Sequence, residues 1–230
     1  MYHKTLRMKK LFIIANWKSN KTIEEAEQWF HDFAEKLKSD SSNIENKEII
    51  VCPSFILFEH ARYCSNNLKL PIRFGAQNIS PFDKGAYTGE VNGEQIKEFA
   101  QYVIIGHSER RKNFSETNEM LKQKVLMAKK YNLMPIFCIQ NQDSPVPQEI
   151  DVIAYEPPTA IGTGNPDTPE NAQRVAKIVK ERTGVANVLY GGSVTSSNVK
   201  TFTNMPDIDG LLVGGASLDS LEFLAIIKNA

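Results

Sequence analysis

The 230-residue sequence predicts an α/β protein, a single (β/α)8 barrel whose fifth helix is shortened or lost. Eight short apolar runs alternate with helical patterns, at about one strand–helix unit per 29 residues. Most runs are continuously apolar, which is typical of parallel strands buried on both faces. The first run continues into Asn16–Asn20 without a glycine. A doubly wound open sheet would usually carry a glycine fingerprint there, so the closed barrel is favoured.

The predicted strands are short and rich in aliphatic and β-branched residues. They are Leu11–Ala15, Ile49–Cys52, Ile72–Ala76, Tyr102–Gly106, Met134–Ile139, Asp151–Tyr155, Asn187–Tyr190 and Gly210–Val213. No linker or low-complexity segment separates them, so we expect one barrel domain over residues 11–230. Residues 1–10 are expected to form an N-terminal extension that is partly disordered.

The segments between these runs carry the sequence signals of helix N-termini and C-termini. A capping box of Thr22 with Glu25 predicts a helix whose apolar face carries Ala26, Trp29, Phe30, Phe33 and Leu37. Ser115 is expected to cap the helix that carries Leu121, Val125 and Ala128. Thr168-Pro169 starts another helix and Gly184 ends it. Segments Asn92–Ala100 and Leu218–Lys228 are also predicted to be helical.

The connection after the fifth strand differs from the others. Gln140–Glu149 contains Pro145 and Pro147. Prolines this close together prevent a regular helix, although a parallel crossover normally includes one. The sequence therefore predicts a loop in place of the fifth helix.

Composition excludes several classes of protein. The chain has 41% hydrophobic and 23% charged residues, and its 27 Lys and Arg balance 27 Asp and Glu. A net charge of zero gives no electrostatic reason to expect a nucleic-acid or anionic-membrane partner. Arg110-Arg111-Lys112 is the densest basic cluster, and we interpret it as a solvated helix start. The three cysteines have no metal-ligand or disulfide spacing, which indicates reduced thiols in a cytoplasmic protein.

Polar residues or glycines follow five of the predicted strands. Asn16 and Lys18 follow the first, His107 and Glu109 the fourth and Glu156 the sixth, while Gly191-Gly192-Ser193 follows the seventh and Gly214-Gly215 the eighth. The C-terminal strand ends of such a barrel meet at one mouth, where active sites lie. Taken singly, Lys18 could be a surface charge, His107 a structural group, Glu156 a loop carboxylate and Gly214-Gly215 a tight turn. Their occurrence together at the matching strand ends favours an active site.

Several strings resemble those of the triosephosphate isomerase family, in family order and over essentially the whole chain from Leu11. They are Asn16-Trp17-Lys18, Tyr102–Arg111 with its GHSERR motif, Tyr155-Glu156-Pro157 with Ala160–Gly164, Tyr190–Val194 and Leu212–Ser217. The resemblance implies a TIM barrel that interconverts dihydroxyacetone phosphate and D-glyceraldehyde 3-phosphate through an enediolate, a step of glycolysis and gluconeogenesis. The family is a familiar case of pKa tuning and lid closure.

The resemblance also implies roles for individual residues. Glu156 matches the general base and His107 the neutral electrophile that polarises the carbonyl oxygen. Lys18 matches the cation that attracts the substrate, Asn16 positions Lys18 and donates a hydrogen bond, and Glu109 matches a supporting carboxylate that pairs with Lys18. Substrate phosphate is expected at Gly162, Ser193, Gly214 and Gly215, held by backbone N–H groups. No metal and no cofactor is expected.

The long connection Ala76–Gly89 also has a counterpart in the family. There the matching loop reaches into a second subunit, and its threonine, here Thr88, supports the neighbour's Asn16, Lys18 and His107 region. The resemblance therefore implies a homo-oligomer, most simply a dimer, with a tetramer as the alternative because the missing helix leaves one flank of the barrel less covered. The other expected partner is the triose phosphate itself.

The chain departs from the family pattern in two further places. The fifth strand runs into Gln140-Asn141 where the family usually has Gly-Glu, and the lid begins Pro157-Pro158-Thr159 where most members carry an aliphatic residue and Trp after the first Pro. Two alternatives stay open: another phosphate-binding barrel, such as a sugar-phosphate epimerase or an indole-glycerol-type synthase, and an inactive barrel that acts as a scaffold. An assay of glyceraldehyde 3-phosphate isomerisation discriminates among the three.

Overall fold

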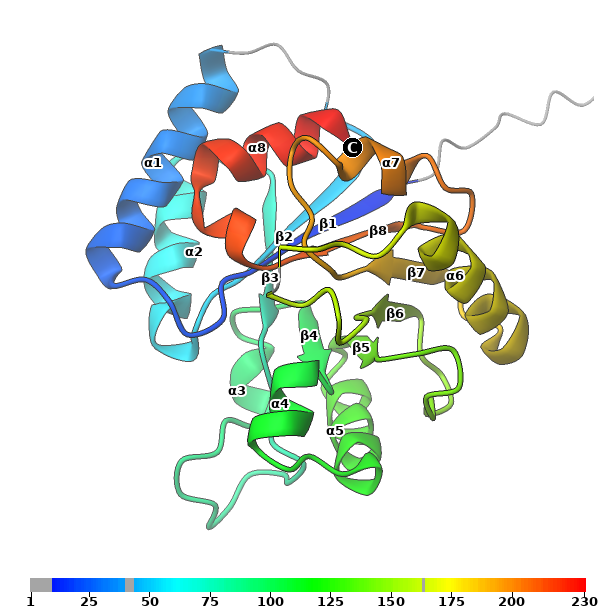
Figure 1. Cartoon of the computed structure of the whole chain (residues 1–230). Helices are drawn as coiled ribbons and strands as arrows, with labels where there is room; N and C mark the ends of the chain where they lie inside the picture. The colour runs from blue at the N-terminus through cyan, green and yellow to red at the C-terminus, as the bar shows by residue number, and fades with distance from the viewer. Residues whose placement is uncertain (1–9, 40–43, 163) are drawn as a thin grey trace, which may run out of the picture.

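A computed structural model describes residues 10–39, 44–162 and 164–230. Its centre is a closed barrel in which eight parallel strands follow one another in sequence order, and β1 pairs with both β2 and β8 (Figure 1). The strands are β1 Leu11–Asn16, β2 Lys47–Cys52, β3 Ile72–Ala76, β4 Tyr102–Ile105, β5 Met134–Ile139, β6 Val152–Tyr155, β7 Asn187–Tyr190 and β8 Gly210–Val213. The predicted (β/α)8 fold is confirmed.

Helices surround the barrel and connect consecutive strands, except β5 and β6 (Figure 1). The α-helices are α1 Ile23–Ser39, α2 Phe58–Asn67, α3 Gly93–Ile96, α4 Ser108–Asn113, α5 Asn118–Lys130, α6 Pro169–Thr183, α7 Val199–Thr203 and α8 Ser220–Asn229, with 3-10 turns η1 Phe55–Leu57 and η2 Gly215–Leu218. Among the described residues, none of these helices is both long and apolar enough to cross a membrane.

Most helix ends lie where their signals predicted them. Thr22 and Glu25 exchange both capping-box hydrogen bonds, and α6 begins after Thr168 and ends at Gly184 in the left-handed conformation. The prediction for Ser115 is wrong: its φ of 53° does not fit an N-cap, and the Thr117 side chain caps α5 by accepting the Met120 N–H.

Two predicted helices are shorter than expected. In the segment Asn92–Ala100 only Gly93–Ile96 is α-helical, although Asn92 makes a capping box with Gln95. In the last segment α8 begins at Ser220, because the Asp219 side chain accepts the Leu221 and Glu222 N–H groups and the preceding residues form η2.

The connection between β5 and β6 contains no helix, as predicted (Figure 1). Residues 140–151 form turns and extended chain, with Ile150 buried and Val146 packed against the hydrophobic core. Arg174 donates to Gln142 at 2.6 Å, and Arg182 donates to the Ser144 carbonyl at 2.9 Å. Contacts from α6 therefore hold this segment against the barrel.

Both faces of the strands are buried, which explains their continuous apolar character. One set of side chains, including Ile14, Ile50 and Ile136, forms a cluster separate from the set that packs with the helices, such as Ile13 and Val51. Because β1 begins at Leu11 and α8 ends at Asn229, we propose 11–230 as the barrel domain. Of the predicted N-terminal extension, residues 1–9 lie outside the described residues, and Lys10 pairs with Glu48.

Candidate active site

The barrel mouth contains a cavity of about 290 Å³. Side chains at the ends of β1, β4 and β6 and backbone groups of the loops after β7 and β8 line this cavity. The predicted residues that line it are Asn16, Lys18, His107, Glu156, Gly162, Ser193, Gly214 and Gly215. Glu109 does not line this cavity and instead lines a neighbouring one of about 280 Å³, together with Asn16, Lys18 and His107.

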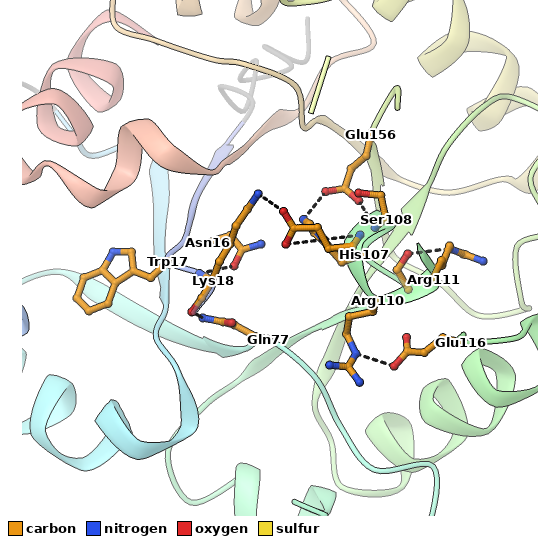
Figure 2. Close-up of polar contacts among 12 residues, drawn as sticks. Asn16, Trp17, Lys18, Gln77, His107, Ser108, Arg110, Arg111, Glu116 and Glu156 are labelled. Atoms are coloured by element: carbon orange, nitrogen blue, oxygen red, sulfur yellow. Dashed lines mark hydrogen bonds and ion pairs between the residues drawn. The ribbon is translucent and has the colours of Figure 1, made fainter. Parts of the chain in front are cut away.

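Glu156 follows β6 directly, and this residue is 2% exposed. Its Oε1 lies 2.9 Å from His107 Nε2, and its Oε2 accepts the Ser108 backbone N–H at 3.1 Å (Figure 2). Ser108 is not among the predicted site residues, because its contribution comes from the backbone and leaves no side-chain signal. In this arrangement the residues after β4 hold the carboxylate at the wall of the cavity.

His107 is the N-cap of α4, and this position defines its tautomer. Its Nδ1 accepts the Glu109 backbone N–H at 3.2 Å, so the proton of the neutral imidazole is on Nε2, the atom that faces Glu156. Burial opposes protonation most strongly, but the Glu156 carboxylate, aided by Glu109, outweighs it and raises the pKa of His107 above its ordinary value. Protonated His107 would form an ion pair with Glu156, and this pair stabilises the fold at low pH and is lost as pH rises through the raised pKa.

The Glu156→Gln substitution is predicted to lower the pKa of His107 relative to the wild-type protein. It removes the carboxylate that raises this pKa and leaves burial, which lowers it, as the largest remaining influence. An NMR titration of the His107 imidazole signals in the wild-type and variant proteins measures the change. An unchanged or higher pKa of His107 in the variant would show that Glu156 does not govern its protonation.

Both the backbone and the side chain of Lys18 are fixed by contacts with neighbouring residues. Its φ of 54° lies in the left-handed region, which is unfavourable for a residue with a long side chain. Asn16 Oδ1 accepts the Lys18 N–H at 3.1 Å, and Gln77 Nε2 donates to the carbonyls of Lys18 and Cys52 at 2.8 and 2.9 Å (Figure 2). The Lys18 ammonium pairs with Glu109. Gln77 was missed, although it directly follows the end of β3 and the post-strand pattern could have identified it.

The expected phosphate positions lie in the cavity that Glu109 does not line. Ser193, whose φ is 45°, donates from its hydroxyl to the Ala160 carbonyl at 2.6 Å. At Gly214 a Cβ atom would lie 3.4 Å from Lys18 Cε, and at Gly162 and Gly215 a Cβ atom would meet no atom within 4 Å. The glycines therefore leave backbone groups open to the cavity beside the Lys18 side chain.

The basic cluster after β4 is not a solvated helix start. Arg110 Nε lies 2.6 Å from the buried Glu116 carboxylate (Figure 2). Arg111 donates to the carbonyls of Gly106 and Cys138 at 2.8 and 3.0 Å. Of the three basic residues, Lys112 alone is exposed. The interpretation was wrong because the partners of Arg110 and Arg111 lie outside the helix. These two arginines fix the chain that carries His107.

Cys138 on β5 lies close enough to Glu156 for the two side chains to interact. Burial, followed by the charge of Glu156, raises the pKa of Cys138 well above its ordinary value, so this side chain stays a neutral thiol. Across the described segments, no group of three His, Cys, Asp or Glu side chains is arranged to hold a metal ion.

A (β/α)8 barrel that gathers a carboxylate, an imidazole and an ammonium group around one small cavity at its mouth has the features of a barrel enzyme that acts on a small molecule. A family model described as triosephosphate isomerase matches residues 11–149 and 144–230. The triosephosphate isomerase of Shewanella loihica is 38% identical over 263 residues, covering 98% of this chain and 99% of the relative. Those of Shewanella frigidimarina and Shewanella denitrificans are 38% and 37% identical over 259 residues, covering 96% of this chain and 97% of each relative.

The chain belongs to the triosephosphate isomerase family. Its activity is the interconversion of dihydroxyacetone phosphate and D-glyceraldehyde 3-phosphate, an isomerase step of glycolysis.

Proposed function

We propose that Glu156 and His107 carry out the proton transfers of this isomerisation. Glu156 removes a proton from the carbon beside the carbonyl group, and the C–H electron pair forms the double bond of an enediolate. His107 donates a hydrogen bond from Nε2 to the oxygen that gains negative charge, and Glu156 then returns a proton to the neighbouring carbon. The observation that supports this most strongly is the 2.9 Å approach of Glu156 to the Nε2 atom of His107 at the cavity wall.

Lys18 is proposed to supply the positive charge that the enediolate and the phosphate need. Its strained backbone and its bonds to Asn16 and Gln77 fix the direction in which its side chain leaves the chain. Asn16 is proposed to donate its amide hydrogen bond to the substrate. Glu109 holds the ammonium group at the edge of the cavity until substrate arrives. Preorganised charge of this kind costs little reorganisation during the reaction.

The phosphate group is proposed to bind at Gly162, Ser193, Gly214 and Gly215, where the cavity wall is open backbone. Residues 157–162 and 164–166, here called the lid segment, contribute Gly162 and would close over the substrate. A coupled assay that follows glyceraldehyde 3-phosphate isomerisation, without added metal or cofactor, tests the proposal. Turnover supports it, whereas both alternatives, a different phosphate-binding barrel and an inactive scaffold, require that none occurs.

We propose that the active form is a homodimer. The loop after β3 extends away from the barrel (Figure 1) and carries Phe82 and Tyr87, which stack at 4.4 Å and remain 47% and 44% exposed. Exposed aromatic pairs of this kind are typical of interfaces. The cavity lined by Lys18, His107 and Glu109 is proposed to receive the same loop, with Thr88, from a second copy.

Tyr87→Asp is expected to shift the protein toward monomer and to lower specific activity by at least about tenfold, because a charge replaces an apolar anchor. Sedimentation together with activity at the same concentrations measures both effects and distinguishes dimer from tetramer. Leu221→Asp, at an exposed position at the start of α8, is the matched control. A monomer of Tyr87→Asp with wild-type activity would contradict the proposed interface.

The cellular location is proposed to be the cytoplasm. Cys52, Cys64 and Cys138 are all free and buried. Unpaired cysteines of this kind suit a reducing compartment.

A further inference from the structure

The lid segment is joined to the barrel at each of its ends, and within it the Ala160 carbonyl accepts the Ser193 hydroxyl. At its N-terminal end it follows Glu156 and β6, and at its C-terminal end it leads through Asp167 into Thr168, the N-cap of α6. Asp167 lies outside the cavity and is only partly exposed. How firmly the C-terminal end is held at Asp167 limits how the described lid residues can move over the cavity.

Asp167 makes four hydrogen bonds. Its backbone N–H donates to the Tyr190 hydroxyl at 2.7 Å. Its carboxylate Oδ2 accepts from the Tyr155 hydroxyl at 3.1 Å and from Asn171 Nδ2 at 2.6 Å, and Oδ1 accepts the Thr168 N–H at 2.8 Å. The side chain of Thr168 already caps α6 by accepting the Asn171 N–H. The carboxylate of Asp167 is therefore not needed to start this helix.

The two tyrosines connect Asp167 with two parts of the active site, the proposed general base Glu156 and the loop after β7. Tyr155 directly precedes Glu156, and Tyr190 directly precedes the Gly191–Ser193 loop. Both tyrosines are buried. Burial raises the pKa of Tyr190 to about 12 and, together with Asp167, raises that of Tyr155, so both hydroxyls stay protonated. At Gly192 a Cβ atom would lie 2.7 Å from the Tyr190 hydroxyl, so glycine is required for this packing.

We propose that the Asp167 carboxylate is a positioning residue for the isomerisation, because it fixes the C-terminal attachment of the lid to Tyr155 and hence to the strand that carries Glu156. The inference rests on the proposed role of the lid segment. With this attachment fixed, movement is concentrated in the lid itself, where Gly162 and Gly164 have φ of 67° and 76°. Without the carboxylate, the lid end gains freedom and the buried Tyr155 hydroxyl loses its acceptor.

A less firmly held lid should increase the fraction of the enediolate that loses its phosphate group. An enediolate that is not fully enclosed can break its C–O bond to the phosphate group, which releases inorganic phosphate and leaves an enol that becomes methylglyoxal. This elimination competes with proton return from Glu156. The ratio of phosphate released to isomerisation turnovers therefore reports lid closure and does not depend on the amount of folded protein.

The test compares Asp167→Ala, Tyr155→Phe and the double variant with the wild-type protein. Each single variant is expected to raise the elimination ratio about fivefold or more and to lower kcat/KM about tenfold, as expected for a lost hydrogen bond to a charged group. The double variant should match the single ones, since both remove the same contact. Glu170→Ala removes a carboxylate from the exposed start of α6 and should leave both quantities unchanged.

Asp167→Asn, which keeps the side-chain volume, serves if Asp167→Ala does not fold, and it should change the ratio in the same direction. Lower thermal stability with an unchanged elimination ratio in both Tyr155→Phe and Asp167→Asn would overturn the proposal and leave a structural role only. Additive effects in the double variant would overturn the link through Tyr155. Absence of isomerisation by the wild-type protein would instead contradict the proposed function.

Discussion

Glu156→Gln is expected to lower kcat by about 10²–10⁴, the usual contribution of a general base in the transition state. Glutamine keeps the shape of the side chain and can still accept the Ser108 N–H, but it cannot take a proton from carbon. Because no phosphate contact changes, KM should remain within a small factor of the wild-type value. Steady-state kinetics in both directions of the reaction measures these effects.

Glu170→Gln, an exposed position on α6, is the control for loss of one carboxylate. Near wild-type kcat in Glu156→Gln would remove the base from the proposed mechanism. A large rise in KM at unchanged kcat would instead assign Glu156 to substrate binding.

Lys18→Met is expected to lower kcat/KM by about 10²–10³, the range found when one preorganised donor to a developing oxyanion is removed. Methionine keeps much of the length of the side chain and removes the ammonium group. The variant also leaves the Glu109 carboxylate without its partner beside the cavity, so the site repels an anionic substrate and KM should rise as well.

Kinetics over a range of salt concentrations separates these two contributions, since screening weakens the repulsion but does not restore the lost donor. Lys112→Met, an exposed cation on α4, the helix that follows His107, is the matched control. Activity of Lys18→Met within threefold of the control would contradict the role given to Lys18; threefold is about 0.65 kcal/mol, well below one lost donor.

The fold could be predicted because the barrel imposes the same requirement on every strand. In β5, for example, residues 135–139 are buried and the strand is therefore apolar, and the prolines at 145 and 147 exclude a fifth helix. Helix ends were less predictable, since they depend on local backbone conformation. Ser115 has a left-handed φ, so Thr117 caps α5 in its place, and α8 begins only after its N-cap Asp219.

The candidate site could be located from the rule that barrel chemistry lies after the strands. This rule places Lys18, His107 and Glu156 beside one cavity, and their catalytic roles stay predictions. The rule does not reveal contacts between distant segments. Arg111 bonds to the Cys138 carbonyl, and Asp167 bonds to Tyr155 and Tyr190. The sequence presents these residues as ordinary surface charges, because their partners are far away along the chain.

The most direct test of the proposed mechanism is isomerisation in D2O, followed by NMR of the product. If Glu156 carries the proton between the two carbons, the wild-type protein converts glyceraldehyde 3-phosphate to dihydroxyacetone phosphate without added metal or cofactor. Part of the product then carries deuterium at the carbon that receives the proton, because a carboxyl proton can exchange with solvent before it is returned. Absence of conversion, or conversion with no deuterium incorporated, as in a direct hydride shift, would contradict the mechanism.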